Sequence, residues 1–306
     1  MGKKSVQRIV DAHIHWWDLE NNYYPWLMDQ KAEEGGLAVD ESLARTYVYE
    51  NYMADAEGYD VEAFVHIQAE WDPRDPVGET KWLQGLIDND RIGGKPLAIV
   101  GFANFAADNV EEILAGHAEC ANARSIRHML NYLPDNPALC WADQDYLQND
   151  AWVKNFPLLK KYGLDFDPMC FSNHLPGIAK LAGENPEIKV ILEHAGMPYD
   201  HTPEGRAVWA KAMRTFAERD NAAIKISGFG NTMESWTEEK IRPYVLEIIE
   251  AFGTDRVCFA SNFPTDGQFS DMAAIWDAFL SITGNFSQDE KDAMFAENAY
   301  RLYRFG

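Results

Sequence analysis

The sequence is poor in basic residues. Its 27 lysines and arginines stand against 49 aspartates and glutamates, which gives a net charge of −22. Such a charge repels the phosphates of nucleic acids and anionic membrane surfaces. We therefore expect a small-molecule partner, and neither nucleic acid nor a membrane. An acidic substrate stays compatible with this charge, because a few arginines can invert the potential inside a cleft.

Cysteines are also few, and long apolar runs are absent. Four cysteines in 306 residues show no Cys-x-x-Cys spacing, which is typical of reduced thiols in a cytosolic protein. The first residues lack the apolar stretch of a signal peptide, and no run of about 18 apolar residues indicates a membrane span. These features predict a cytoplasmic protein.

What the sequence does contain is a repeat of short β-like runs, most of them followed by an amphipathic helical pattern. Eight such units without a Pro- or Ser-rich linker predict one α/β domain over residues 1–306, a single (β/α)8 barrel. An open doubly wound sheet is the competitor, but no Gly-x-Gly-x-x-Gly follows the first run. The expected strands are Ile9–His15, Ala63–Glu70, Leu97–Phe102, Ser125–Leu130, Leu164–Cys170, Lys189–His194, Ala223–Ser227 and Arg256–Ser261. The expected helices are Glu79–Ile87, Val110–Ala118, Trp152–Lys161, Leu175–Leu181, Pro203–Glu218, Glu238–Phe252 and Met272–Ile282.

One segment, at about residues 16–59, does not fit the repeat and is rich in aromatic residues. In a barrel it leaves the C-terminal end of the first strand and lies over the mouth. It is then a lid that walls an apolar part of the substrate pocket, with Trp17 and Trp26 as candidate substrate contacts. An ordinary packed loop or an oligomer contact, with a homodimer as the partner, is an equally weighted interpretation.

Two histidines one residue apart, His13 and His15, close the first expected strand. Alternate side chains of a strand share a face, so both imidazoles and Asp11 are expected to point the same way. Two nitrogens on one rigid strand end form half of a metal site at little ordering cost. The pattern favours a metal site over a pair of structural histidines.

The other expected strand ends are polar as well, and in a barrel functional side chains gather where strands end. The second strand ends at Glu70, the fourth carries Arg127, and His174 follows the fifth. The sixth ends in Glu193 and His194, which face opposite ways on a strand, so only one of them is expected to point inward. Histidines at three strand ends form a constellation that chance placement does not explain.

Motifs along the whole chain resemble the amidohydrolase-2 family. They are the His-x-His of the first strand, FDPMCFSNHLP at the fifth, VILEHAGMP at the sixth, IKISGFG at the seventh and FASNFP at the eighth. The segments DAHIHWWD…YPWL, VHIQAEWDPRDPVGETKWL and SIRHMLN are more closely similar to its lactonase branch, the sugar-lactone and dicarboxylate-lactone hydrolases. The resemblance runs from about Ile9 to Phe305.

The resemblance implies a TIM-like barrel in which His13, His15 and His174 bind one divalent metal, zinc or manganese. It also implies that His194 orients or protonates, and that an acid on the eighth strand serves as ligand and general base. Asn262 stands where that acid is usual, and an amide oxygen is a weak ligand that accepts no proton at neutral pH. The fourth strand lacks the lysine that related two-metal enzymes carbamylate, so we expect one metal, or a metal-free enzyme.

Glu70 is the first candidate to replace the missing base and Asp266 the second, although each could equally form an ion pair or cap a helix. Arg127 is the first candidate to pair with a substrate carboxylate, because its planar guanidinium suits that geometry. Arg74 and Arg124 are weaker candidates for the same role.

Three functions stay open on this basis. The first is a hydrolase that opens a lactone ring with an activated water. The second is a metal-dependent decarboxylase or lactone isomerase of the same superfamily, which the missing strand-eight acid disfavours. The third is a non-catalytic binder, supported only by Asn262. The aromatic segment and the arginines suggest a flat or ring-shaped substrate that bears acid groups.

Overall fold

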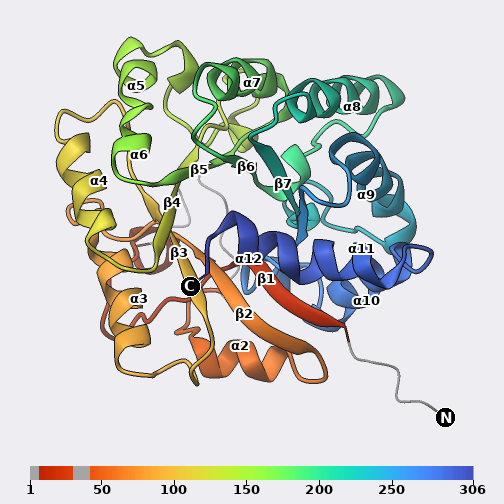
Figure 1. Ribbon diagram of the computed structural model, residues 1–306, viewed down its shortest axis with the longest axis horizontal. Coiled ribbons are helices and arrows are strands. Elements are labelled where there is room, and N and C mark those ends of the chain that lie inside the picture. Colours follow the sequence, from red (N-terminus) through yellow and green to blue (C-terminus); the bar gives the residue numbers. More distant parts are fainter. Residues whose placement is uncertain (1–6, 30–41, 306) are drawn as a thin grey trace.

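The computed structural model describes residues 7–29 and 42–305. Its eight strands are parallel, and each pairs with the next in chain order. The segment after the last strand closes the ring, because Asn262 N–H donates to the carbonyl of His13 at 2.9 Å and His15 N–H donates to that of Phe263 at 2.8 Å. The predicted single (β/α)8 barrel is confirmed (Figure 1). The strands are β1 Arg8–Ile14, β2 Asp60–Ile67, β3 Leu97–Phe102, β4 Ala123–Met129, β5 Asp165–Met169, β6 Val190–Leu192, β7 Ala222–Ile226 and β8 Val257–Phe259.

Helices surround this sheet, and α3 to α10 follow one another around it (Figure 1). The expected helix Trp152–Lys161 is in fact two helices, α5 and α6, with Pro157 between them. Proline has no N–H to donate and restricts the residue before it, so the helix stops there. The helices are α1 Pro25–Met28, α2 Tyr49–Asp55, α3 Gly78–Asp88, α4 Val110–Ala118, α5 Asp150–Asn155, α6 Leu158–Lys161, α7 Leu175–Glu184, α8 Pro203–Ala217, α9 Glu238–Phe252, α10 Met272–Ile282, α11 Gln288–Asp292 and α12 Asn298–Leu302.

Three strands end two or three residues earlier than the sequence predicts. β2 ends at Ile67, β6 at Leu192 and β8 at Phe259. Shortly after each of these ends, the backbone turns through a non-glycine residue with positive φ, at Glu70 (58°), His194 (54°) and Asn262 (57°). Such residues are uncommon and tend to occur at functional sites. These turns determine where the side chains of three predicted site residues point.

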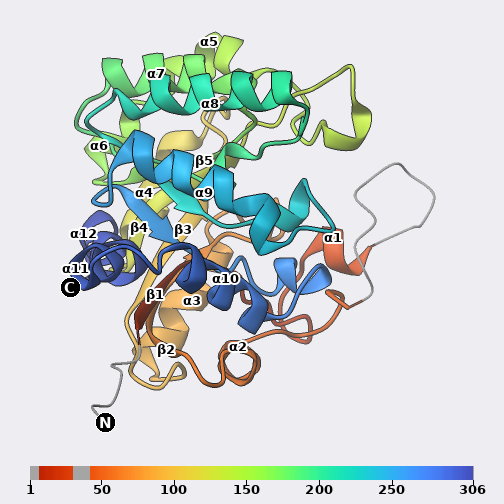
Figure 2. The ribbon, with the colours of Figure 1, turned by 90° about the vertical axis from the view of Figure 1, so that its right-hand side faces the viewer.

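The inside of the barrel is filled largely by small apolar side chains. Val10, Ala63, Ala98, Ala223 and their buried neighbours pack with one another. Leu302 and Tyr303, in and just after α12, belong to the same cluster and close the end of the barrel where the strands begin. Figure 2 shows α11 and α12 on one side of the molecule and α1 on the opposite side.

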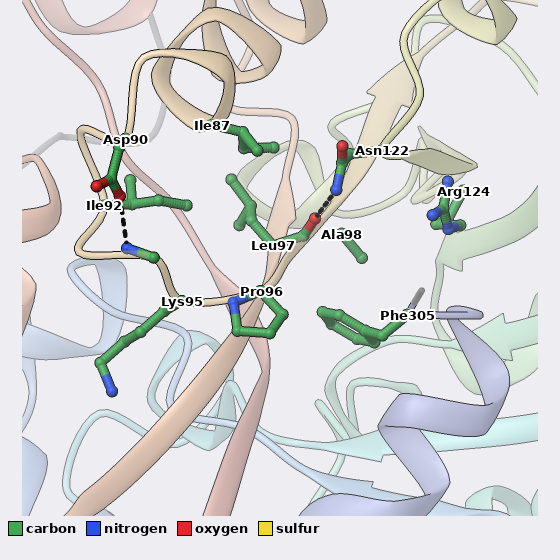
Figure 3. Close-up of a pocket in the computed structure, with 11 residues that line it drawn as sticks. Ile87, Asp90, Ile92, Lys95, Pro96, Leu97, Ala98, Asn122, Arg124 and Phe305 are labelled. Carbon is green, nitrogen blue, oxygen red and sulfur yellow. Dashed lines mark hydrogen bonds between the residues drawn. The ribbon is translucent and has the colours of Figure 1, made fainter.

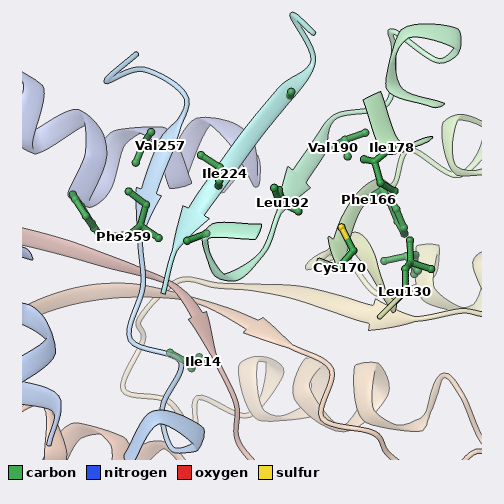
Figure 4. Close-up of a cluster of buried hydrophobic side chains, with 14 of the residues drawn as sticks. Ile14, Leu130, Phe166, Cys170, Ile178, Val190, Leu192, Ile224, Val257 and Phe259 are labelled. Carbon is green, nitrogen blue, oxygen red and sulfur yellow. The ribbon is translucent and has the colours of Figure 1, made fainter. Parts of the chain in front are cut away.

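A second apolar layer lies between the strands and the surrounding helices. Phe166, Val190, Ile224 and Phe259 project from four strands into this layer, and Ile178 of α7 packs there too (Figure 4). Burying a side chain of this size stabilises the fold by roughly 1.5–3 kcal/mol. The layer holds the strands, and with them the strand ends, in place.

No helix in the described part of the chain is long and apolar enough to cross a membrane.

The aromatic segment after β1 packs against the barrel at both of its described parts. Trp17 forms an antiparallel bridge with Tyr47, and the hydroxyl of Tyr52 on α2 donates to Asp11 Oδ2 at 2.6 Å. Residues 30–41 of the predicted lid lie outside the described residues. The role of the segment as a lid stays a prediction.

Candidate functional site

The two histidines of β1 meet at the C-terminal end of that strand. His13 Nε2 and His15 Nε2 are 3.2 Å apart, and both imidazoles are buried. His15 Nδ1 lies 2.8 Å from the carbonyl oxygen of Ile67, which can only accept, so Nδ1 carries the proton and Nε2 keeps its lone pair. Burial lowers the pKa of both histidines well below the usual value, which keeps them neutral. Neutral imidazole is the form that binds a metal ion.

Glu193 and His194 both reach this pair from the end of β6. Each of His13, Glu193 and His194 offers a ligand atom, and these atoms lie within 4.8 Å of one another. The prediction that only one of Glu193 and His194 points inward is wrong. β6 has already ended at Leu192, and the left-handed backbone of His194 removes the alternation that a strand imposes.

Glu193 is a fully buried carboxylate with no hydrogen-bond partner among the described residues. Its Oε1 lies 3.6 Å from His13 Nδ1, and its Oε2 lies 3.6 Å from Arg127 Nη1. Burial raises the pKa of Glu193 to about 7, while the charges of Arg127 and Lys225 act in the opposite direction. Its oxygens are thus available to a ligand.

These atoms could hold one metal ion. Two nitrogens bound to one zinc ion at about 2.1 Å each lie roughly 3.2–3.5 Å apart in a tetrahedral site. The separation of 3.2 Å between His13 Nε2 and His15 Nε2 matches this spacing. The Glu193 charge favours a proton on His13 Nδ1, which leaves the Nε2 lone pair facing that of His15. Two facing lone pairs suit a cation between them.

Arg127 lies beside this cluster and is almost completely buried. Its Nη2 donates to the carbonyl of Gln68 at 2.8 Å and lies 3.8 Å from Glu70 Oε1, while its Nε has no partner in the described structure. Glu70 also accepts a hydrogen bond from Gln68 Nε2 at 2.6 Å, and its side chain is 39% exposed. The predicted residues Arg127 and Glu70 therefore meet at one place, between β2 and β4.

Asn262 and Asp266 form the side of the site that follows β8. Asn262 Nδ2 donates to Asp266 Oδ1 at 2.8 Å, and both side chains are buried. Burial raises the pKa of Asp266 to about 7, although the hydrogen bond from Asn262 acts to lower it. Asn262 is joined through its backbone to His13, as described above, which places this pair next to the histidines.

His194 completes the arrangement. Its ring centroid is 4.3 Å from that of His13, and its Nδ1 lies 3.0 Å from Ser227 Oγ at the end of β7. Burial lowers the pKa of His194 well below the usual value. A neutral ring whose Nδ1 accepts from the serine hydroxyl carries its proton on Nε2 and can donate it in a hydrogen bond.

Three of the predicted site residues lie elsewhere. His174 is not part of the metal-ligating cluster found among the described residues. It lies in the turn before α7 and lines a cavity of about 450 Å³ together with Tyr132, Asp145 and Lys180. Arg74 is 80% exposed and pairs with Asp72 at 2.7 Å. Arg124 also lies away from the site, where its guanidinium donates to the carbonyls of residues 121 and 123.

Of the two tryptophans proposed as substrate contacts, Trp17 lies next to His15 and Trp26 packs against Trp17. Trp17 is stacked at 6.4 Å from the His15 ring and meets Trp26 edge-on at 5.6 Å. The indole N–H of Trp17 donates to Arg45 O, and that of Trp26 donates to Ala69 O. Trp17 is fully buried and Trp26 only partly. Trp26 is therefore the one with surface left for a ligand.

Sequence reasoning did not single out two buried charged residues near the site. Lys225 of β7 and Asp167 of β5 are both completely buried, and Lys225 Nζ lies 2.6 Å from Asp167 Oδ2 and 3.7 Å from Glu193 Oε1. The signal was present, because a lone lysine in the apolar run Ala-Ala-Ile-Lys-Ile is expensive to bury without a partner.

Another cavity, of about 370 Å³, opens at the opposite end of the strands. It lies where β3 and β4 begin and is lined by Lys95, Pro96, Leu97, Arg124 and Phe305 among others (Figure 3). Lys95 already donates to the carbonyl of Val61 at 2.7 Å, and Arg124 is engaged as described above. In a barrel of this kind, residues at this end serve stability.

Known proteins resemble this chain in sequence along most of its length. A family model described as amidohydrolase matches residues 10–305. An uncharacterized protein of Sinorhizobium fredii is 41% identical over 296 residues, which cover 97% of this chain and 98% of that protein. The L-fucono-1,5-lactonase of Burkholderia ambifaria is 26% identical over 219 residues, covering 68% and 70% of the two chains.

The fold is also found among solved structures. A Burkholderia multivorans amidohydrolase, crystallised with bound zinc, superposes with a TM-score of 0.78. It is 21% identical in sequence, and the superposition covers 99% of this chain and 100% of that one.

Proposed function

The chain belongs to the amidohydrolase family and is a hydrolase of that superfamily, and we propose that it opens a lactone ring. One observation carries the proposal. A His-His pair spaced for one cation lies beside a buried carboxylate, a neutral imidazole and a buried arginine. Such a site can polarise an ester carbonyl and activate a water molecule that attacks the carbonyl carbon. The likeness to an L-fucono-1,5-lactonase supports a lactone over other esters and amides.

We assign the metal to His13 and His15, with Glu193 completing or orienting the set. His174 then drops out of the ligand set that the resemblance implied. A divalent ion held there, zinc as in the Burkholderia multivorans structure or manganese, would polarise the carbonyl and lower the pKa of a bound water. Histidine nitrogens and a carboxylate oxygen are ligands that zinc accepts.

Asp266 is the group that we propose as general base, with Glu70 second. A base works best when its pKa lies near the working pH, and that of Asp266 is raised to about 7. Asn262 holds the Asp266 carboxylate through Oδ1. In this arrangement Asn262 positions a base, and the proton from water passes to the Asp266 carboxylate.

His194 is proposed to stabilise the oxyanion that forms when water attacks the carbonyl. Its depressed pKa favours this role over proton donation from a charged imidazolium. We assign the donor role in the Ser227 contact to the serine hydroxyl, which leaves the proton of His194 on Nε2, where it faces the developing charge. A neutral imidazole is a competent donor in such a role.

Arg127 and Trp26 are proposed to select the substrate. The guanidinium of Arg127 suits a carboxylate on the lactone, and the partly buried Trp26 offers a flat apolar face next to Trp17. The substrate is then a small ring with an acid group. A homodimer stays a prediction.

The test is proton release from a panel of lactones, acidic and neutral, by the purified protein. We expect ring opening of at least one acidic lactone and its loss in His194→Ala. Carbon dioxide release from an unsaturated acid would instead support the decarboxylase alternative. Binding without turnover would support the non-catalytic alternative.

A further inference from the structure

Four fully or almost fully buried charges form a chain across the barrel. Lys225 lies 2.6 Å from Asp167 and 3.7 Å from Glu193, and Arg127 lies 3.6 Å from Glu193. Two positive and two negative charges balance in this set. Burying such charges costs several kcal/mol for each ion unless partners compensate them.

Asp167 holds one end of this chain rigidly. Its Oδ1 accepts from Ser125 Oγ at 2.5 Å and its Oδ2 accepts from Tyr303 OH at 2.5 Å. The same Oδ2 forms an ion pair with the Lys225 ammonium at 2.6 Å. Lys225 itself lies over the ring of Tyr303, with Nζ 5.2 Å from the ring centroid. Asp167 and Tyr303 therefore hold the ammonium on the side that faces the end of the barrel closed by α12.

The other side of the ammonium faces the reaction centre. Lys225 Nζ and His13 Nδ1 approach the same oxygen, Glu193 Oε1, at 3.7 and 3.6 Å. Neither distance is short enough for a hydrogen bond, so both groups act on the carboxylate through their charge and polarity. The carboxylate has no other cation on that oxygen among the described residues. Lys225 thus lies on the His13 side of the carboxylate, and Arg127 lies beside the other oxygen.

We propose that Lys225 is a positioning residue, which directs the Glu193 carboxylate onto His13 and so presents the His13 Nε2 lone pair to a cation. The inference rests on the proposed location of the reaction centre, but it does not depend on the substrate being a lactone. Carboxylates that orient a ligating histidine typically affect metal affinity by 10- to 100-fold. Lys225 is one contact further from the metal site than Glu193, because it acts on the Glu193 carboxylate.

The test compares zinc affinity in variants of the full chain, stripped of metal and titrated with zinc against a chelator of known affinity. Lys225→Met combined with Asp167→Asn removes one positive and one negative charge and so leaves the buried set balanced. We expect this variant to fold and to bind zinc about tenfold more weakly. Tyr303→Phe is the matched control, because it removes a bond to the same Asp167 without touching Glu193. It should lower the unfolding midpoint and leave zinc affinity within twofold.

The action of Lys225 through Glu193 is tested by a double-mutant cycle. With Glu193→Gln already in place, replacing Lys225 and Asp167 should weaken zinc binding by less than twofold further. Unchanged zinc affinity in the balanced variant, or full additivity with Glu193→Gln, overturns the proposal. Unchanged affinity would show that Lys225 and Asp167 serve only the stability of the barrel, and full additivity would show that they affect zinc binding by a route other than Glu193.

A measurement on the unmodified chain covers the case in which the balanced variant fails to fold. Nitrogen shifts of the His13 ring, recorded by NMR on zinc-loaded protein, should show the proton on Nδ1. A proton on Nε2 would overturn the proposal. If the unmodified chain binds no zinc, the metal assignment under the proposed function fails. The same spectrum of the zinc-free chain then tests the orientation of His13. A proton on His13 Nδ1 supports orientation by Glu193, and a proton on Nε2 contradicts it.

Discussion

Asn262 donates from Nδ2 to Oδ1 of Asp266, four residues later, at 2.8 Å. The two side chains are buried together beside the C-terminal end of β1. An amide that cannot act as a base therefore holds a carboxyl whose pKa is near neutrality. We propose that the acid missing at position 262 is supplied from position 266.

Asp266→Asn should lower kcat by about 10²–10⁴-fold, the range that general base catalysis contributes. In the unmodified chain kcat/KM should rise with pH through about 7, because the carboxyl must lose its proton to act as a base. A pH–rate profile of both proteins checks this. Glu70→Gln is the comparison, and a larger loss there, or a flat profile between pH 5 and 8, would assign the base to another group.

The set of metal ligands can be tested by changing one histidine at a time. His13→Ala and His15→Ala should each abolish stoichiometric zinc, because together they provide the 3.2 Å nitrogen pair. His174→Ala should retain it, since His174 lines the cavity beside Tyr132 and Lys180 and not the His13–His15 nitrogen pair. Metal content by plasma mass spectrometry decides. Loss of zinc in His174→Ala would restore the ligand set that the family resemblance implied.

Arg127→Lys should raise KM for an acidic lactone about tenfold or more, since a lysine cannot form the planar two-point contact with a carboxylate. It keeps the positive charge next to Glu193, so the fold should survive. Arg74→Lys is the matched control and should leave KM unchanged, because Arg74 is exposed and paired with Asp72. Steady-state kinetics measure both, and equal effects would remove Arg127 from the substrate contacts.

Glu79 gives a stability prediction that is independent of activity. It is buried, accepts from the N–H of Ala69 at 3.0 and 3.1 Å, and burial raises its pKa to about 8. The folded chain thus keeps this proton up to about pH 8, while the unfolded chain loses it near pH 4.5. Between these values the folded state binds more protons, so its stability falls as pH rises.

Glu79→Gln resembles the protonated form and should lack this dependence. Relative to the unmodified chain, the variant should gain roughly 3–5 kcal/mol between pH 4.5 and 8.5, which is the pKa difference expressed as free energy. Urea unfolding at both pH values measures it. Other buried carboxyls, such as Asp266, are present in both proteins and cancel in the difference. Equal slopes with pH would show that Glu79 is ionised in the folded state.

Much of the fold could be predicted from the sequence, because strand and helix periodicities repeat eight times and β1 carries its histidines in regular alternation. The meeting of Glu193 with His194 could not, since it depends on a left-handed turn that strand periodicity does not reveal. Pro157 is visible in the sequence, and it could have been used to divide the expected helix Trp152–Lys161 into two.

The expectation that His174 is a metal ligand had a different origin. Its assignment as a ligand came from resemblance alone, and no local pattern in the sequence says whether the turn after β5 faces the barrel or its flank. Lys225 and Asp167 could have been paired by their cost of burial, but their contact joins β5 and β7, which one-dimensional patterns do not bring together. Long-range pairing of charges is the part that requires the structure.

The most direct test of the central claim is proton release from acidic lactones by zinc-loaded protein, measured beside His194→Ala and after removal of zinc by a chelator. The account predicts turnover that falls by at least 100-fold in His194→Ala and that is lost with the metal and returns with it. Turnover that is unaffected by His194→Ala and by the chelator would contradict it.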